Sequence, residues 1–292
     1  MNVSVLGTGT MGSAMAANLA RAGLSTVVWD RTPSAAAALA SVGVTVAPTL
    51  VDAVRSADVV ITMVSDGNAV ASVATDQGML DSLPAGAVWV QMATIGVDAT
   101  DRMAALTAER RPDVAFVDAP VSGSKGPAER GELIVLASGP ADVVDRLEPV
   151  FDAIGRRTIW AGGAGRGSRL KLVLNSWLAF LAEGLAETVA LADGLGITRD
   201  ELRQAVAGGP LAAPYAMAKL AKIADDDFAP EFPLVLALKD VDLALAATPS
   251  RLPGMAAISE QWHRAVGDGL GDLDISAASL ALQRGAAATV GG

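Results

Sequence analysis

The sequence predicts an α/β protein in which an N-terminal doubly wound parallel sheet is followed by a long interdomain helix and an all-helical C-terminal domain. Short β-rich runs alternate with alanine-rich runs through the first half of the chain, as in a parallel sheet with helices on both faces. A glycine-rich link near residue 162 ends this alternation, and no later segment has the pattern of a strand. We therefore divide the chain into a sheet domain, residues 1–162, and a helical domain, residues 163–292.

Six nearly continuous apolar runs have the composition of strands that are buried on both faces of a parallel sheet. They are Val3–Leu6, Thr26–Trp29, Val59–Met63, Ala87–Gln91, Val114–Asp118 and Leu133–Ala137. Helices are expected between and after them, at Met11–Ala22, Ser34–Ala40, Thr49–Ser56, Gly67–Ala74, Val97–Glu109 and Pro140–Ile154. This regular succession predicts that the strands form one doubly wound sheet.

A long helix is expected from Ser168 to Leu195, and nearly every side chain between Leu170 and Leu181 is apolar. We therefore expect this stretch to be buried on most sides. A domain built around such a helix has more apolar surface than it can cover alone, which predicts a homodimer or homotetramer. Proline and glycine break the remaining helical segments at Gly208–Pro210, Pro230–Pro233 and Pro253–Gly254.

The composition excludes several classes of protein and of site. With 51% hydrophobic and 18% charged residues, the chain is not a disordered polymer. Its formal net charge of −10 argues against a nucleic-acid partner, because lysine and arginine neutralise phosphates. The chain has no cysteine and a single histidine, His263, which excludes disulfides and argues against histidine-based triads and zinc sites. No metal is predicted, and Asp225–Asp227 is expected to form a solvated turn.

The sequence also predicts a cytoplasmic protein without a membrane partner. Met1–Ala22 is apolar, but glycines and threonines interrupt it, which favours a buried strand and helix over a signal peptide. The longest apolar stretch, Leu170–Ala182, is interrupted by two polar residues and is too short to span a bilayer.

A glycine-rich motif directly follows the first expected strand and opens the first helix. It places Gly7, Gly9 and Gly12 around Thr10 and Met11 in the run GTGTMG. The first glycine permits a tight turn, the second lets the backbone approach a pyrophosphate, and the third allows close packing of helix and strand. The motif predicts a Rossmann-type domain that binds a dinucleotide at the N-terminus of this helix.

Asp30, Arg31 and Thr32 directly follow the second expected strand, where such domains bind the adenosine ribose. A carboxylate at this place accepts a hydrogen bond from a ribose 2′-hydroxyl and repels a 2′-phosphate, which favours NAD(H). Arg31 can instead pair with a 2′-phosphate, which favours NADP(H), or stack on the adenine. The two residues conflict, and the sequence leans to NAD(H).

Two further groups of residues could bind or act on a substrate. Ser122 and Gly123 follow the fifth strand in the run DAPVSG, where a hydroxyl and unhindered amides either bind an anion or form an ordinary loop. Lys171 and Asn175 lie at i and i+4 on one face of the long helix. Desolvation would make this lysine a usable general acid or base, and the alternative is a lysine that reaches solvent beside a surface asparagine.

Together these motifs resemble those of the β-hydroxyacid dehydrogenase family, which includes 3-hydroxyisobutyrate dehydrogenase and the tartronate, glyoxylate and succinic semialdehyde reductases. The resemblance implies reversible hydride transfer between NAD(P) and a small β-hydroxy acid or its semialdehyde, so that the partner is a small carboxylate substrate. The matching segments are Gly7–Gly12, Asp118–Gly123, Gly163–Asn175 and Phe232–Asp240.

The resemblance also implies a role for individual residues. Lys171 would be the catalytic acid and base, and Asn175 would hold that lysine or the substrate hydroxyl. Ser122 and Gly123 would bind the substrate carboxylate, while Lys239 would close over the nicotinamide and the substrate. Further contacts to the cofactor would come from Met63, Val64 and Thr94.

Two rival functions remain open at the level of the sequence. An imine reductase has a similar architecture, but its members generally lack this lysine. A non-catalytic cofactor sensor would keep the fold without the chemistry, and the presence of both Lys171 and Asn175 argues against it.

Overall fold

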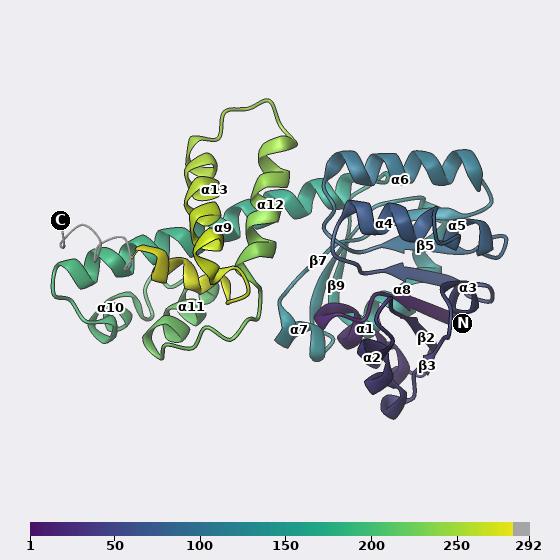
Figure 1. The fold of residues 1–292 in the computed structure, drawn as a ribbon, viewed down its shortest axis with the longest axis horizontal. Helices are drawn as coiled ribbons and strands as arrows, with labels where there is room; N and C mark the ends of the chain where they lie inside the picture. Colours follow the sequence, from purple (N-terminus) through teal and green to yellow (C-terminus); the bar gives the residue numbers. More distant parts are fainter. Residues whose placement is uncertain (283–292) are drawn as a thin grey trace. The chain divides into compact units, whose positions relative to one another are not determined.

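The computed structural model describes residues 1–282 and divides the chain into two compact units, Met1–Lys171 and Leu172–Gly292. The division falls inside the long helix α9 (Arg166–Gly194), so the first turns of that helix belong to the first unit. Each unit has its own secondary structure, sheet-based in the first and helical in the second (Figure 1).

The first unit is built on a six-stranded parallel sheet in the order β3-β2-β1-β4-β5-β6. The order reverses between β1 and β4, as in a doubly wound Rossmann-type sheet, which confirms the predicted fold class. The strands are β1 (Asn2–Leu6), β2 (Ser25–Trp29), β3 (Thr45–Val46), β4 (Val59–Thr62), β5 (Val88–Gln91) and β6 (Ala115–Asp118).

The strands are apolar on both faces because helices cover both faces. Val59 and Ile61 of β4 join one core with α1, whereas Val60 between them joins the other core, as the alternation of side chains along a strand requires. In the second core the rings of Trp89 and Phe116 meet edge to face, with centroids 5.0 Å apart. The helices here are α1 (Thr10–Arg21), α2 (Pro33–Ala37), α3 (Leu50–Val54), α4 (Gly67–Ala74), α5 (Met79–Ser82) and α6 (Val97–Arg110).

A second sheet corrects the prediction that all strands belong to one. The run Leu133–Ala137 is β8, which pairs with β7 (Val121–Ser122) and β9 (Gly155–Trp160) in a separate three-stranded sheet. The main sheet still has six strands, because β3 pairs with β2 at its edge. The sequence did not indicate β3 and β7 because each is two residues long, and exposed Arg156 and Arg157 interrupt the apolar pattern of β9. Between β7 and β9 lie α7 (Lys125–Glu129) and α8 (Val144–Ile154).

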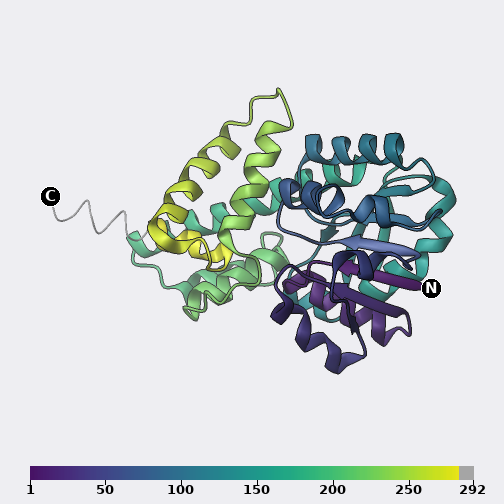
Figure 2. The ribbon, with the colours of Figure 1, turned by 45° about the vertical axis from the view of Figure 1, so that its right-hand side comes forward.

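The second unit has no strand within residues 172–282, as predicted. Its helix α10 begins at a capping box in which Thr198 and Glu201 satisfy each other's backbone amides, and prolines occupy the first turns of α11 and α13. After α9 come α10 (Arg199–Val206), α11 (Pro214–Ala224), α12 (Leu234–Ala246) and α13 (Pro253–Ala265), which Figure 2 shows from a second side.

The long helix α9 is less buried than its composition indicated. Val173 and Trp177 are each 65% exposed and Phe180 is 43% exposed, so the prediction of burial on most sides is wrong for the single chain. At 29 residues, α9 is long and apolar enough to cross a membrane by length and composition alone, and 39% of its most apolar part is buried. Buried core helices of globular proteins meet the same criterion, so it is weak evidence for a membrane span.

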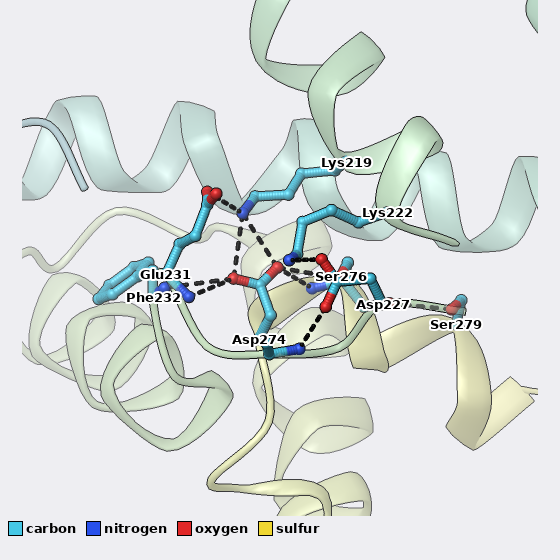
Figure 3. Close-up of polar contacts among 9 residues, drawn as sticks. Lys219, Lys222, Asp227, Glu231, Phe232, Asp274, Ser276 and Ser279 are labelled. Carbon is cyan, nitrogen blue, oxygen red and sulfur yellow. Dashed lines mark hydrogen bonds and ion pairs between the residues drawn. The ribbon is translucent and has the colours of Figure 1, made fainter. Parts of the chain in front are cut away.

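A buried ion pair anchors the segment that leads into α12. The Lys219 ammonium lies 3.0 Å from the Asp274 carboxylate and 3.2 Å from that of Glu231 (Figure 3). Asp274 also accepts hydrogen bonds from the amides of Glu231 (3.1 Å) and Phe232 (3.2 Å). Burial alone would raise the pKa of Asp274, but the bond and charge of Lys219 outweigh it and lower the pKa. The ionised pair therefore fixes the start of α12 against α11.

A second buried carboxylate, Glu183 of α9, accepts a hydrogen bond of 2.6 Å from the indole nitrogen of Trp262 in α13. Both side chains are buried. Burial raises the pKa of Glu183, although the bond from Trp262 opposes the shift. The folded chain therefore binds this proton more tightly than the unfolded chain does.

We expect Glu183→Gln to stabilise the chain at pH 8 and to leave its stability unchanged near pH 4. Folding raises the pKa of Glu183, so binding of its proton contributes to the free energy of unfolding. That contribution is fully present below the pKa of the unfolded chain and is lost as the pH rises through the pKa of the folded chain. Glutamine has no such proton to lose, and its carbonyl oxygen accepts the same bond from Trp262. Thermal unfolding should give a Tm about 2–4 °C higher for the variant at pH 8.

The exposed residue Glu148 provides the control, because Glu148→Gln should leave the Tm unchanged at both pH values. A Tm for Glu183→Gln at pH 8 that equals or falls below the wild-type Tm would show that deprotonation of Glu183 does not destabilise the folded chain.

Candidate active site

The site begins at the edge of the main sheet where the parallel strands end. Gly7 follows β1, Asp30 follows β2, Met63 follows β4, and Asp118 is the last residue of β6. Because these strands are parallel neighbours in one sheet, their carboxyl ends lie at one edge, where doubly wound folds bind ligands. The structure thus brings the predicted cofactor-binding residues that follow β1, β2 and β4 to one edge of the main sheet.

The glycine-rich turn has almost no room at two of its glycines and open space at the third. Gly7 has a φ of +97°, and a Cβ there would lie 2.4 Å from the carbonyl oxygen of Met63. A Cβ at Gly12 would lie 2.0 Å from the carbonyl oxygen of Gly7. A Cβ at Gly9 would meet nothing within 4 Å. Gly7 and Gly12 are therefore required by packing, whereas Gly9 leaves a space open for a ligand.

The same turn presents an uncapped helix N-terminus. Gly9 is the N-cap of α1, no side chain caps it, and no acidic residue lies in the first turn. Gly9 and Thr10 are exposed, and Met11 is half-buried. A free helix N-terminus beside an open space suits a diphosphate, because backbone amides and the helix dipole both favour negative charge. These residues fit the dinucleotide that the motif predicts.

Asp30 braces this turn. One carboxylate oxygen accepts hydrogen bonds from the amide (2.7 Å) and hydroxyl (3.0 Å) of Thr8, and the other accepts one from the amide of Thr32 (2.8 Å). Burial alone would raise the pKa of Asp30, but these bonds outweigh it and lower the pKa. Arg31 and Thr32 are exposed beside it. Asp30 therefore stays ionised and is engaged with the protein's own backbone.

The cofactor contacts expected after β4 and β5 lie at the same edge. Met63 and Val64 line the turn, since a Cβ at Gly7 would be 3.0 Å from a methyl group of Val64. Thr94 is half-buried after β5, just before Gly96, the N-cap of α6.

The loop expected to hold the substrate carboxylate is shaped by packing. Ser122 is half-buried and ends β7, and Gly123 is exposed with a φ of +135°. A Cβ at Gly123 would lie 2.7 Å from the side chain of Leu133, so only glycine fits. The loop keeps its backbone accessible at this position.

One face of α9 carries the two residues predicted to act on the substrate. Lys171 is 9% exposed and Asn175 is 6% exposed, so both are buried on this face. A lysine that reaches solvent and a surface asparagine, the alternative left open by the sequence, do not match this burial.

In the second unit a buried carboxylate joins two of the predicted residues. The side-chain amide of Asn175 donates a hydrogen bond of 2.5 Å to one oxygen of Asp240, and the Lys239 ammonium lies 3.3 Å from the other. Asp240 is only 4% exposed. Sequence reasoning missed its role, although an acidic residue beside a lysine in the apolar helix α12 was the signal available.

Two features set aside in the sequence remain outside this site. His263 pairs with Asp242 at 3.0 Å on the facing surfaces of α13 and α12. In the acidic run, Asp226 pairs with Arg199 and Asp227 with Lys222. Among residues 1–282, no group of three or more side chains is arranged to hold a metal ion.

Both units match known protein families. Residues 2–162 match the family described as the NAD-binding domain of 6-phosphogluconate dehydrogenase. Residues 165–282 match the family described as NAD-binding of NADP-dependent 3-hydroxyisobutyrate dehydrogenase. The chain is 35% identical to glyoxylate/succinic semialdehyde reductase 1 of Arabidopsis thaliana over 281 residues, which cover 95% of this chain and 96% of that protein. The chain belongs to the β-hydroxyacid dehydrogenase family.

Other relatives of this β-hydroxyacid dehydrogenase agree. It is 32% identical to 2-(hydroxymethyl)glutarate dehydrogenase of Eubacterium barkeri over 285 residues, which cover 95% of this chain and 93% of that protein. The solved structure of 3-hydroxyisobutyrate dehydrogenase from Mycobacterium tuberculosis, with L-serine, superimposes with a TM-score of 0.87 at 30% identity and covers 96% of this chain and 98% of that one. The protein is therefore an oxidoreductase with a nicotinamide cofactor, acting on a hydroxyl or carbonyl group.

Two glycine substitutions should separate folding from cofactor binding. Gly9→Ala places a methyl group in the open space, so we expect the affinity for the dinucleotide to fall at least about tenfold while the Tm stays unchanged. Gly12→Ala forces a clash with the backbone of Gly7, so we expect a loss of about 1–3 kcal/mol of folding free energy.

Cofactor titration by fluorescence and thermal unfolding of both variants check this pair. Unchanged affinity in Gly9→Ala, or an unchanged Tm in Gly12→Ala, would contradict the geometry assigned to the turn.

Proposed function

We propose that this dehydrogenase interconverts a small β-hydroxy acid and its semialdehyde by hydride transfer, with Lys171 as the general acid and base. The observation that supports the proposal is the buried face of α9, where Lys171 and Asn175 lie, in a chain whose predicted cofactor-binding residues after β1, β2 and β4 lie at one edge of the main sheet. A buried ammonium held in place is suited to exchanging one proton with a substrate oxygen.

The chain's residues would share the work as follows. Lys171 gives its proton to the carbonyl oxygen during reduction and takes it back from the hydroxyl during oxidation. Asn175, held by Asp240, orients the reacting oxygen or the lysine, and the backbone at Ser122 and Gly123 binds the carboxylate. The bound nicotinamide supplies or accepts the hydride.

Lys239 would place a second positive charge over the substrate. Its ammonium is paired with the buried carboxylate of Asp240, and its side chain is 28% exposed, so it reaches the surface of the second unit. A cation held in this way can attract a carboxylate substrate without being a proton donor itself.

We infer that the cofactor is NADP(H), against the sequence's lean to NAD(H). The carboxylate of Asp30 accepts hydrogen bonds from Thr8 and Thr32, so it stabilises the glycine-rich turn. Arg31 is exposed beside it. The family matched by the second unit is described as NADP-dependent. A guanidinium at this place can bind a 2′-phosphate by charge-assisted hydrogen bonds.

The proposed activity is tested by initial rates at 340 nm against a panel of β-hydroxy acids and semialdehydes, each with both nicotinamides. We expect turnover with the wild type and a loss of at least about 10²-fold in Lys171→Ala, with cofactor binding unchanged. The control is Lys222→Ala, because Lys222 is a half-buried lysine of α11 whose ammonium pairs with Asp227 at 2.7 Å, outside the proposed site, and its loss should leave turnover unchanged.

Two other outcomes would overturn the proposal. Turnover that survives Lys171→Ala would remove this lysine from the mechanism, and reduction of an imine by the same variant would then support an imine reductase. A wild type that binds the dinucleotide but turns over no member of the panel would favour a cofactor sensor.

Arg31→Ala tests the choice of nicotinamide. Loss of the guanidinium should raise the KM for NADPH about tenfold and leave the KM for NADH within about twofold. Arg55→Ala is the control, because Arg55 is an exposed arginine of the same unit that pairs with Asp52. Equal effects of Arg31→Ala on the two nicotinamides would contradict the assignment to NADP(H).

A further inference from the structure

Asp118 is a buried acidic residue at the point where the two sheets of the first unit meet. It ends β6 and is 0% exposed. Its amide donates a hydrogen bond of 2.9 Å to the carbonyl oxygen of Ser138, and the amide of Ser138 donates one of 2.8 Å in return. This antiparallel bridge joins the end of the main sheet to the segment that follows β8.

The Asp118 side chain is bound to the first turn of α9. One carboxylate oxygen accepts a hydrogen bond of 2.7 Å from the amide of Ser168, and the other accepts one of 2.6 Å from its hydroxyl. The Ser138 hydroxyl, 3.1 Å from the same carboxylate, accepts a hydrogen bond of 2.9 Å from the amide of Gly167. A carboxylate and a hydroxyl from the sheets thus satisfy amides that a helix N-terminus leaves without partners.

The backbone of this turn has no freedom to move toward the sheets. A Cβ at Gly167 would lie 2.1 Å from the carbonyl oxygen of Leu136 and 2.9 Å from that of Asp118. The hydroxyl of Ser168 also lies 3.1 Å from that of Thr100, which donates a hydrogen bond of 2.8 Å to the carbonyl oxygen of Gly96. The first turn of α9 is therefore fixed against both sheets and against the start of α6.

We propose that Asp118 is a positioning residue for Lys171, through the first turn of α9. Lys171 lies three residues after Ser168, so the two share a face of the helix and the anchored turn sets where the lysine emerges. Gly123 lies five residues after Asp118 in the chain. Asp118 therefore binds the helix turn that carries Lys171 and also begins the segment that leads to the loop proposed to bind the substrate carboxylate. The inference rests on the proposed role of Lys171.

The chemistry of the network favours positioning over simple stabilisation. Burial raises the pKa of Asp118, and hydrogen bonds from Ser168 and Ser138 oppose that shift. Keeping a carboxylate here therefore costs desolvation free energy on folding. An apolar residue at a sheet junction would fold without that cost. The carboxylate instead provides two acceptor oxygens in a fixed direction, which holds a helix end in one place.

A double-mutant cycle tests the inference, because a positioning residue has nothing to position once the lysine is gone. Asp118→Asn keeps the size of the side chain but replaces one acceptor oxygen by a donor. In the wild-type background we expect kcat to fall about 10²-fold, with KM and the dissociation constant for the dinucleotide within about twofold. In the Lys171→Ala background the same change should lower the residual kcat by less than about threefold.

Asp101→Asn is the matched control. Asp101 also binds the first turns of α9, through Arg169 at 2.8 Å, but both side chains of that pair are about half exposed. It should leave kcat unchanged in both backgrounds, because an exposed pair is solvated and holds the helix weakly.

Ser168→Ala provides a second variant if Asp118→Asn fails to fold. It removes the hydroxyl that donates to Asp118 and leaves the amide bond in place, so we expect kcat to fall about tenfold in the wild-type background and by less than about threefold beside Lys171→Ala.

Three outcomes would overturn the inference. The first is equal loss of kcat from Asp118→Asn in both backgrounds, which would mark a merely structural residue. The second is a kcat within twofold of the wild type while Lys171→Ala abolishes turnover, which would leave the proposed function intact. The third is wild-type turnover in Lys171→Ala, which would overturn the proposed function as well.

Discussion

The close approach of α1 to the end of β1 is the constraint on which the cofactor edge depends. At Gly12 there is no room for even one methyl group against the carbonyl oxygen of Gly7. This contact places the uncapped N-terminus of α1 beside the open space at Gly9. Asp30 then fixes the turn from the neighbouring strand through Thr8. The residues that follow β4 and β5 lie at the same edge of the sheet as this turn.

Buried carboxylates join separate segments of this protein. Asp118, Glu183, Asp240 and Asp274 are each buried, and each is bonded to a group on another segment. Burying an unpartnered carboxylate would cost several kcal/mol, so each of these groups is stable only while its partners stay in place. The bonds to these carboxylates therefore hold the first turn of α9 in the first unit, and in the second unit they join the rest of α9 to α12 and α13 and fix the segment before α12.

Much of the first unit could be predicted from its sequence, because strands buried on both faces leave continuous apolar runs even at four or five residues. The runs that became β1, β2, β4, β5 and β6 were placed to within one residue at each end. β3 and β7 left no pattern, since two residues are too few to show one, and Leu133–Ala137 looked like a strand of the main sheet because burial makes all such runs alike. The exposed face of α9 could not be foreseen, because composition does not say which apolar side chains find neighbours. The self-association expected from that helix stays a prediction.

The sequence by itself determined the fold class and the family, because a glycine motif between strand and helix and a lysine four residues before an asparagine are local patterns. It also placed Lys171 and Asn175 on one helix face, since helical spacing alone decides that. Only the tertiary structure decided that Asp240 joins Asn175 to Lys239 and that Asp118 holds the first turn of α9. Ser168 is 50 residues from Asp118, and Asn175 is 65 residues from Asp240, and no local pattern records which distant group will satisfy a buried charge.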